Sequence, residues 1–359
     1  TEHDAISFAR SAQTQDFADL ASQLQRARVI VATVPYLNAN LHLFSLIAPT
    51  TAIVDEAAQL LEPHLLALAI RVERMVMIGD VCQLPAVVEQ DDRGCRVQHP
   101  LLEAIGLERL DRSLFERLLR LAKRNHWTHA YGRLIEQARM HHLIARFPGT
   151  QFYGTIFRSM HRWQDEAPEV LPIETLPLLL RHRLVFVDTP RESASGYNRS
   201  EAQIAATCTR ALVKACHDCS PSQTIGIVTP FRKQIRTIAE LLEDLTEDVT
   251  IDTVERFQGS ERDHIIVSCA VNSRQHLRRI ESPTELDGRT IDRKLNVALT
   301  RARHQVILIG NRQLLELSPH YAALIGFIEQ HGIVVSAAEA MQALSPFLTS
   351  HVNHAHHWH

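Results

Sequence analysis

The chain has 359 residues, 45% of them hydrophobic, and a formal net charge of −3. A chain of this length and apolar content holds about two domains with real cores. The nearly balanced charge excludes a strongly basic coat for nucleic acid but not a local basic groove. No apolar run approaches the roughly 18 residues that span a bilayer, and no secretory leader is visible. We therefore expect no membrane partner and a cytoplasmic protein, or a nuclear one in a eukaryote.

The cysteines and the chain ends give weaker indications. Six scattered cysteines argue against a disulfide framework and for a reducing compartment. Cys216 and Cys219 have the spacing of half a zinc site, but without a convincing fourth ligand we expect ordinary cysteines. The histidine-dense residues 351–359 favour an unstructured tail with adventitious metal affinity. Because the sequence opens without Met, we expect the natural protein to begin upstream.

Hydrophobic periodicity predicts alternating strands and helices in the first third of the chain. A helical lead-in over residues 1–27 precedes predicted strands at 29–34, 51–54 and 75–78. Predicted helices cover 60–70 and 114–122, and Ser113 is placed to cap the second of them. Strand, helix and strand in quick succession predict a parallel, doubly wound sheet.

A second set of α/β signals starts near Asn125. The predicted strands are 131–139, 184–187, 224–228, 249–252, 265–269 and 306–309, and the predicted helices are 140–147, 200–214, 231–245 and 293–303. This alternation predicts a second doubly wound domain. We expect a first domain over residues 1–122, a second over 123–340, and the histidine-rich tail over 341–359.

The strand at residues 51–54 runs directly into Asp55 and Glu56. A buried strand would deliver both carboxylates to the carboxyl edge of a sheet, where open α/β folds bind ligands. Adjacent carboxylates repel unless a cation lies between them or one stays protonated. A magnesium ion that carries a phosphate chain meets this need. The alternative is a surface pair at the N-terminal end of a helix dipole.

Four further stretches share this chemistry, because each ends a strand or begins a helix on the edge where phosphates bind. With the first, the stretches are VDEAAQ (54–59), GDVCQLP (79–85), QARMH (137–141), DTVERFQGSE (252–261) and LNVALTRAR (295–303). Each stretch alone has a structural explanation, such as a turn, a capping amide or an amphipathic helix. Their occurrence together favours phosphate chemistry.

In this order the stretches resemble motifs II, III, IV, V and VI of superfamily 1 helicases, in the branch that contains the nonsense-mediated-decay helicase and senataxin. The resemblance covers about residues 28–311. It implies two RecA-like, doubly wound parallel-sheet domains, the first incomplete, which clamp ATP at their interface and grip single-stranded DNA or RNA. The implied function is the C-terminal portion of an ATP-dependent 5′-to-3′ helicase or translocase.

The resemblance also implies residue roles in the first domain. Asp55 would hold Mg²⁺ through water, and Glu56 would polarise the attacking water. Gln59 and Gln83 would sense the γ-phosphate. Further nucleotide-site positions are Gly79 and Asp80, of which Asp80 would steady the loop.

In the second domain, Arg139 and Arg301 would act as arginine fingers, which neutralise charge on the transferred phosphoryl group. Gly259 would permit close backbone approach, and Glu261 would contact the ribose or its surroundings. The candidates for nucleic-acid phosphates are Thr33 and Thr253.

The sequence departs from this family at its phosphate-binding loop. It contains no G-x-x-x-x-G-K-[ST], and none of its four lysines follows a glycine. That loop cradles the phosphates and supplies a lysine to the β- and γ-phosphates. Smaller departures are Ala86 and Ala138. We expect an upstream segment or a partner chain to supply the loop and pair the edge of the first sheet, and we expect these 359 residues alone not to hydrolyse ATP at a helicase rate.

A competing interpretation is a non-catalytic RecA-like module that binds nucleic acid or protein and has lost the phosphate-binding loop. The missing loop supports it, whereas the retained set Asp55, Glu56, Gln83, Arg139 and Arg301 opposes it. A weaker alternative is a metal-binding protein built on the histidine tail and the two neighbouring cysteines.

Overall fold

The computed structural model describes residues 17–168, 170–193, 196–215, 220–243, 245–246 and 248–348. The chain divides into two compact units: residues 1–81 with 85–132, and residues 82–84 with 133–359. Cys216, Cys219 and the tail at 351–359 lie outside the described residues. The predictions about them therefore stay predictions.

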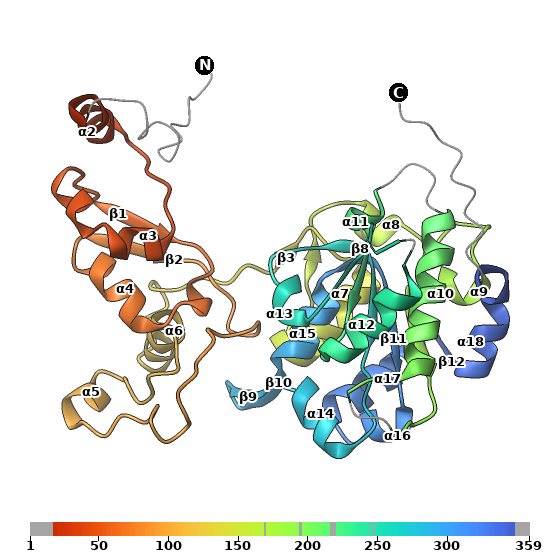
Figure 1. Cartoon of the computed structure of the whole chain (residues 1–359). Helices are drawn as coiled ribbons and strands as arrows, with labels where there is room; N and C mark the ends of the chain where they lie inside the picture. The colour runs from red at the N-terminus through yellow and green to blue at the C-terminus, as the bar shows by residue number, and fades with distance from the viewer. Residues whose placement is uncertain are drawn as a thin grey trace. The chain divides into compact units, whose positions relative to one another are not determined.

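The first unit contains a two-stranded parallel sheet with a small core (Figure 1). Strand β1 (Thr51–Val54) pairs with β2 (Arg74–Met77). Side chains from α4 and α6 pack on one face of this sheet around Val54. The helices are α2 (Phe17–Arg26), α3 (Val34–Ala39), α4 (Glu62–Ala69), α5 (Pro100–Ala104) and α6 (Leu114–Arg124), with 3-10 turns η1 (Leu41–Ser45) and η2 (Ala57–Gln59).

The other face of this sheet is apolar and exposed. Ile53 and Val76 lie opposite one another in the register and are 70% and 50% exposed. Parallel sheets are almost always covered on both faces. Within the described residues, the first unit therefore has one layer fewer than a parallel sheet normally has.

The second unit is built on a six-stranded sheet in the order β12-β5-β11-β8-β6-β7, with every neighbouring pair parallel. Its strands are β5 (Leu184–Asp188), β6 (Ile225–Val228), β7 (Thr250–Asp252), β8 (Arg262–Ser268), β11 (Ala302–Gly310) and β12 (Ile333–Ser336). The central strands are continuous apolar runs because helices cover both faces.

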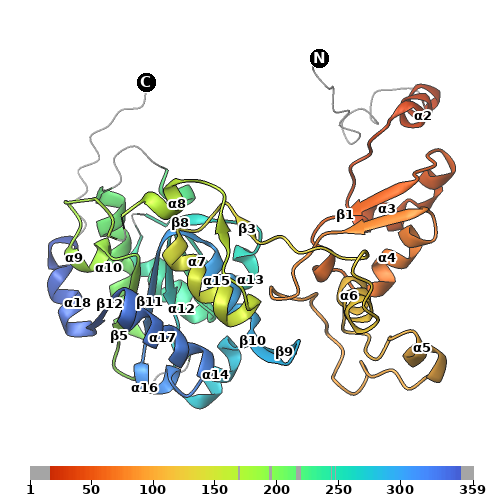
Figure 2. The same cartoon turned by 180° about the vertical axis from the view of Figure 1, so that it is seen from behind.

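Helices α10 (Arg199–Ala215), α12 (Arg232–Leu241) and α18 (Ala337–Ala343) cover one face, and α7 (His142–Pro148), α15 (Arg293–Thr300) and α17 (Pro319–His331) cover the other (Figures 1 and 2). This arrangement confirms the predicted doubly wound α/β fold. The remaining elements are β3 (Glu136–Gln137), η3 (Gly149–Tyr153), β4 (Arg158–Ser159), α8 (Trp163–Glu166), α9 (Leu178–Arg181), α11 (Pro221–Thr224), α13 (Val254–Phe257), α14 (Arg274–Ile280), β9 (Pro283–Leu286), β10 (Arg289–Asp292), α16 (Arg312–Leu315) and η4 (Ser345–Phe347).

Four predicted elements differ from the structure, and one of them is the helix predicted at 231–245, which ends at Leu241. Residues 29–33 form no strand, and Val31 is 93% exposed. Their β-branched side chains favour a strand, but among the described residues no neighbouring strand pairs with them. The strand predicted at 131–139 is reduced to Glu136–Gln137, and the helix predicted at 293–303 ends at Thr300 because the chain enters β11 at Ala302.

A buried carboxyl group joins helix α10 to the end of strand β8. Glu201 is fully buried, and its Oε2 accepts hydrogen bonds from Ser268 Oγ at 2.9 Å and from Ala270 N at 2.8 Å. Gln234 Nε2 donates to the same Ser268 Oγ at 2.9 Å. Burial raises the pKa of Glu201 from 4.5 to about 8, because it disfavours the charged carboxylate.

This raised pKa predicts a pH-dependent stability. The folded chain binds the Glu201 proton more tightly than the unfolded chain, so the stabilisation is fully present below pH 4.5 and is lost as the pH rises towards about 8. We expect Glu201→Gln to flatten the pH dependence of the free energy of unfolding, measured by urea denaturation. Glu240→Gln, an exposed acid on α12, is the control. An unchanged slope in Glu201→Gln would contradict the assignment.

Two glycines of the second unit give a matched stability test. A Cβ added at Gly332 would clash with Leu184 O and lie 2.8 Å from Leu184 Cβ, whereas one added at Gly326 in α17 meets nothing within 4 Å. We expect Gly332→Ala to lower the free energy of unfolding by about 1–3 kcal/mol or more, since β12 must move from β5. Gly326→Ala should raise it by up to about 1 kcal/mol through helix propensity. Equal effects in thermal unfolding would contradict this packing.

Candidate functional site

The acidic turn of the first unit is fixed by local hydrogen bonds. Asp55 and Glu56 follow β1 and are both exposed. Glu56 has a left-handed backbone (φ 52°), a conformation that costs free energy outside glycine and is found at functional turns. Glu56 N donates to Asp55 Oδ1 at 2.9 Å, and Gln59 Nε2 donates to Glu56 Oε2 at 2.6 Å. The structure thus brings three predicted site residues together.

The end of β2 holds this turn in place. Ala57 N donates to Ile78 O at 2.8 Å, and a Cβ on Gly79 would lie 2.8 Å from Ala58 N. Gly79 therefore has a clear packing reason for lacking a side chain. Asp80 follows and is half-buried. The two positions lie directly beside the acidic turn, as parallel pairing of β1 and β2 requires.

An ion pair organises the predicted residues of the second unit. Arg139 precedes α7, and its Nε donates to Glu261 Oε2 at 2.6 Å while its Nη1 donates to Thr300 O at 3.1 Å. The Arg139 guanidinium holds the pKa of Glu261 below its usual value. One arginine therefore contacts the residue before β8 and the end of α15.

Arg301 has a different environment from Arg139. Arg301 is 2% exposed, and its guanidinium donates to Val297 O at 3.2 Å, Ser260 O at 3.3 Å and Thr300 Oγ1 at 3.1 Å. The side chain of Arg139 is 33% exposed. Arg139 is accordingly the more accessible guanidinium of the two.

Gly259 and the two threonines lie at turns and helix starts. Gly259 adopts φ +79° with open space where a Cβ would point, so the backbone there is accessible. Thr253 begins α13, and its N donates to Asp252 Oδ1 at 2.8 Å. Thr33 begins α3 in the first unit, and its Oγ1 accepts from Tyr36 N at 3.3 Å.

Asn296 is a site residue that sequence reasoning did not single out. It is fully buried in α15, and its Nδ2 donates to Cys82 O at 2.8 Å and to Tyr153 Oη at 3.1 Å. These bonds hold Cys82–Leu84, and with it the half-buried Gln83, on the second unit. The sequence signal that could have identified Asn296 is its polar side chain within the otherwise apolar run of α15.

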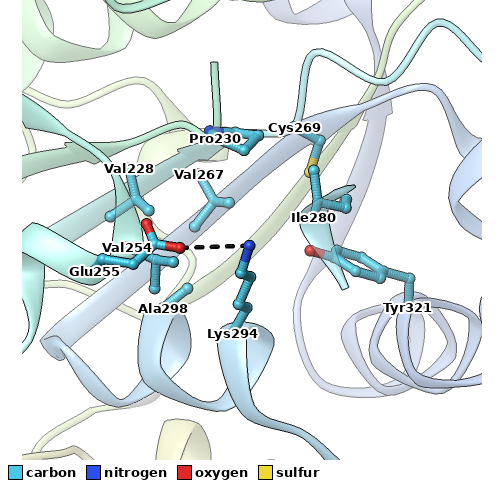
Figure 3. Close-up of a pocket in the computed structure, with 10 residues that line it drawn as sticks. All are labelled: Val228, Pro230, Val254, Glu255, Val267, Cys269, Ile280, Lys294, Ala298 and Tyr321. Carbon is cyan, nitrogen blue, oxygen red and sulfur yellow. Dashed lines mark ion pairs between the residues drawn. The ribbon is translucent and has the colours of Figure 1, made fainter. Parts of the chain in front are cut away.

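A pocket of about 50 Å³ opens at the carboxyl ends of β6 and β8 (Figure 3). Its walls are mainly apolar, with Val228 and Val267 from the strands, and the ion pair between Glu255 and Lys294 at 3.4 Å lies at one side. Small-molecule sites usually enclose about 300–1,000 Å³. This pocket is too small to hold a nucleotide.

No described helix is long and apolar enough to cross a membrane. In the same part of the chain, no group of three His, Cys, Asp or Glu side chains is placed to hold a metal ion by itself. A divalent cation at Asp55 would therefore need oxygen atoms from water or from a ligand.

The chain is similar in sequence to two protein-family models and to several helicase-related proteins. Two family models, each described as an AAA domain, match residues 4–91 and 110–313. The chain is 29% identical over 296 residues to "Regulator of nonsense transcripts 1 homolog" of Arabidopsis thaliana, covering 79% of this chain and 21% of that protein. It is 30% identical to "Regulator of nonsense transcripts 1" of Caenorhabditis elegans, covering 77% and 25%.

A third relative carries an activity in its name. The chain is 29% identical over 315 residues to "ATP-dependent helicase upf1" of Schizosaccharomyces pombe, covering 83% of this chain and 31% of that protein. The chain thus spans between about a fifth and a third of the length of these relatives.

The bonds of Asn296 predict a local effect on the Cys82–Leu84 segment. We expect Asn296→Leu to remove the hydrogen bond to Cys82 O, to destabilise the second unit by about 1–3 kcal/mol, and to speed amide hydrogen exchange around residues 82–84. Tyr153→Phe removes only the hydroxyl partner and should leave that exchange nearly unchanged. Equal exchange rates in the Asn296→Leu variant and the unmodified chain would refute the role of Asn296.

Proposed function

We propose that this chain, which belongs to the AAA-domain family of superfamily 1B helicases, is the C-terminal portion of an ATP-dependent 5′-to-3′ helicase or translocase. Its branch of that family contains the nonsense-mediated-decay helicase and senataxin. In this proposal residues 1–122 are a remnant of the first RecA-like domain and residues 123–340 form the second. Its reaction is ATP hydrolysis coupled to movement along single-stranded DNA or RNA.

One observation supports this proposal most strongly. Residues 139, 261 and 300–301 come from three separate stretches of the sequence, and the second unit joins them through the contacts of Arg139 with Glu261 Oε2 and Thr300 O. A partly exposed guanidinium held by a carboxylate is pre-oriented and can still bind phosphate oxygens through its remaining N–H groups. We assign to Arg139 and Arg301 the neutralisation of charge on the transferred phosphoryl group. We assign to Glu261 and Gly259 contacts with the nucleotide.

The acidic turn supplies complementary groups. Asp55 is an exposed carboxylate at the end of a strand, which suits a Mg²⁺ ion that keeps waters and takes its other ligands from phosphates. Such an ion would neutralise phosphate charge. Glu56 would accept a proton from the attacking water, and its contact with Gln59 Nε2 fixes its orientation. Gln83, with Gly79 and Asp80, would position the γ-phosphate.

The proposal requires a phosphate-binding loop from outside these 359 residues. We propose that an upstream segment or a partner chain adds a strand, the loop and a helix to the first unit. The exposed apolar pair Ile53 and Val76 supports this, because a further layer would cover the open face of the β1–β2 sheet.

Single-strand binding would rest on phosphate contacts. Thr33 and Thr253 each begin a short helix and are the proposed contacts, together with nearby backbone amides. Such contacts are sensitive to salt and tolerant of sequence. The proposed strand is therefore not read by its bases.

A second candidate is a non-catalytic RecA-like module that binds nucleic acid or protein. The environment of Arg301 favours it, since a guanidinium hydrogen-bonded to Val297 O and Ser260 O serves the fold as it stands. ATP turnover decides between the two candidates.

We expect Glu56→Gln to lower ATP turnover by about 10²–10⁴-fold when the chain is assembled with the proposed phosphate-binding loop, because the general base is lost. Arg139→Gln should lower it by about 10³–10⁵-fold. The measurement is phosphate release with and without single strands. Glu103→Gln, an exposed acid on α5, is the control and should retain activity. Normal turnover in Glu56→Gln would refute Glu56 as the general base, whereas no turnover in the unmodified protein would favour the non-catalytic module.

The 359-residue chain by itself should show no robust magnesium-dependent turnover, because its sequence contains no G-x-x-x-x-G-K-[ST] to supply the lysine and amides of the phosphate-binding loop. The same assay tests this. Robust hydrolysis by this polypeptide would refute the need for a supplied loop.

A further inference from the structure

A pocket of about 220 Å³ in the first unit is rich in arginine. It lies between residues 106–112 and one face of α6, and Gly106 lets the loop approach that helix, since a Cβ there would lie 2.9 Å from Leu121 Cδ2. Positions 117, 120 and 124 recur at helical spacing and so share this face. The arginines that line the pocket are Arg109, Arg112, Arg117, Arg120 and Arg124.

Two of these arginines are committed to the fold. Arg117 donates to both carboxylate oxygens of Glu62, at 2.6 and 2.8 Å, and to Ile105 O at 2.8 Å. Arg109 donates to the carboxylates of Asp92 and Asp111, and it lowers the pKa of both acids. Arg109 and Arg117 therefore line the pocket, but their guanidinium groups are already engaged by protein acceptors.

The other three retain donor capacity towards the pocket. The side chain of Arg124 is exposed and has no hydrogen bond or ion pair to any described residue. Arg120 Nη2 donates to Glu116 Oε1 at 2.8 Å, while its buried Nε has no acceptor among the described residues. Arg112 Nη1 donates to Glu108 Oε2 at 3.1 Å and its Nε lies 3.8 Å from Glu116 Oε1, and Glu108, which also lines the pocket, is 57% exposed. A buried N–H without an acceptor is costly, so an oxygen ligand here would be favourable.

We propose that this pocket binds a phosphate group. Three guanidinium groups that reach the pocket from a loop and from a helix match the separate oxygens of a tetrahedral anion, whereas a planar carboxylate is satisfied by a single guanidinium fork. The volume accommodates a phosphate and is below that of a typical drug-sized site. The group is either free phosphate or a phosphate of a nucleic-acid backbone. The proposal needs no ATP turnover and so does not rest on the proposed function.

The test is calorimetric titration of the full chain with inorganic phosphate at constant ionic strength. We expect saturable binding that weakens by about tenfold or more in Arg124→Gln and further in Arg120→Gln/Arg124→Gln, because each change removes charge-assisted hydrogen bonds. Arg124 has no described partner, so its single variant should fold normally. Arg93→Gln, an exposed arginine of the same unit outside the pocket, is the matched control and should bind like the unmodified chain.

Competition with a single-stranded oligonucleotide separates the two sources of phosphate. Displacement of phosphate by the oligonucleotide assigns the pocket to a nucleic-acid backbone, and retention of phosphate assigns it to free phosphate. Equal phosphate binding by the unmodified chain and both pocket variants would overturn the proposal, as would an equal loss in Arg93→Gln. Binding of a polyglutamate peptide without phosphate binding would also overturn it.

Discussion

The ion pair between Arg139 and Glu261 is the contact on which the second unit's site depends. It joins residues 122 positions apart, and the same guanidinium reaches Thr300 O. These partners meet because β8 and β11 are neighbours in the sheet, with Arg262 N donating to Arg301 O at 2.9 Å. The strand order thus determines the position of each charged group, and α7 is attached to that edge through Arg139.

The first unit carries a well-fixed acidic turn on an incomplete scaffold. The backbone around Glu56 is held by hydrogen bonds to Asp55 and to the end of β2, and these local bonds position the two carboxylates. The sheet beneath them has two strands and one exposed apolar face within the described residues. An added layer would bury that face and stabilise a turn whose geometry already exists.

Much of the second unit was predictable because its central strands are buried on both sides. Continuous apolar runs at β5, β6, β8 and β11 are typical of covered parallel strands, and the order of the charged stretches identified the family. The strand predicted over residues 29–34 was wrong, because β-branched composition indicates what a segment can form and not whether a neighbouring strand exists. The role of Asn296 was not predicted, because its hydrogen-bond partner Cys82 O lies 214 positions away in the sequence.

The sequence by itself determined the α/β class, the acidic pair after β1 and the charged stretches of the second unit, because residue type and local periodicity report backbone pairing and burial directly. Tertiary structure alone decided that Arg139 rests on Glu261, that Arg301 is buried against backbone carbonyls, and that several arginines around α6 surround one pocket. Hydrogen-bond partners distant in the chain are chosen by strand order and loop packing, which local patterns do not encode.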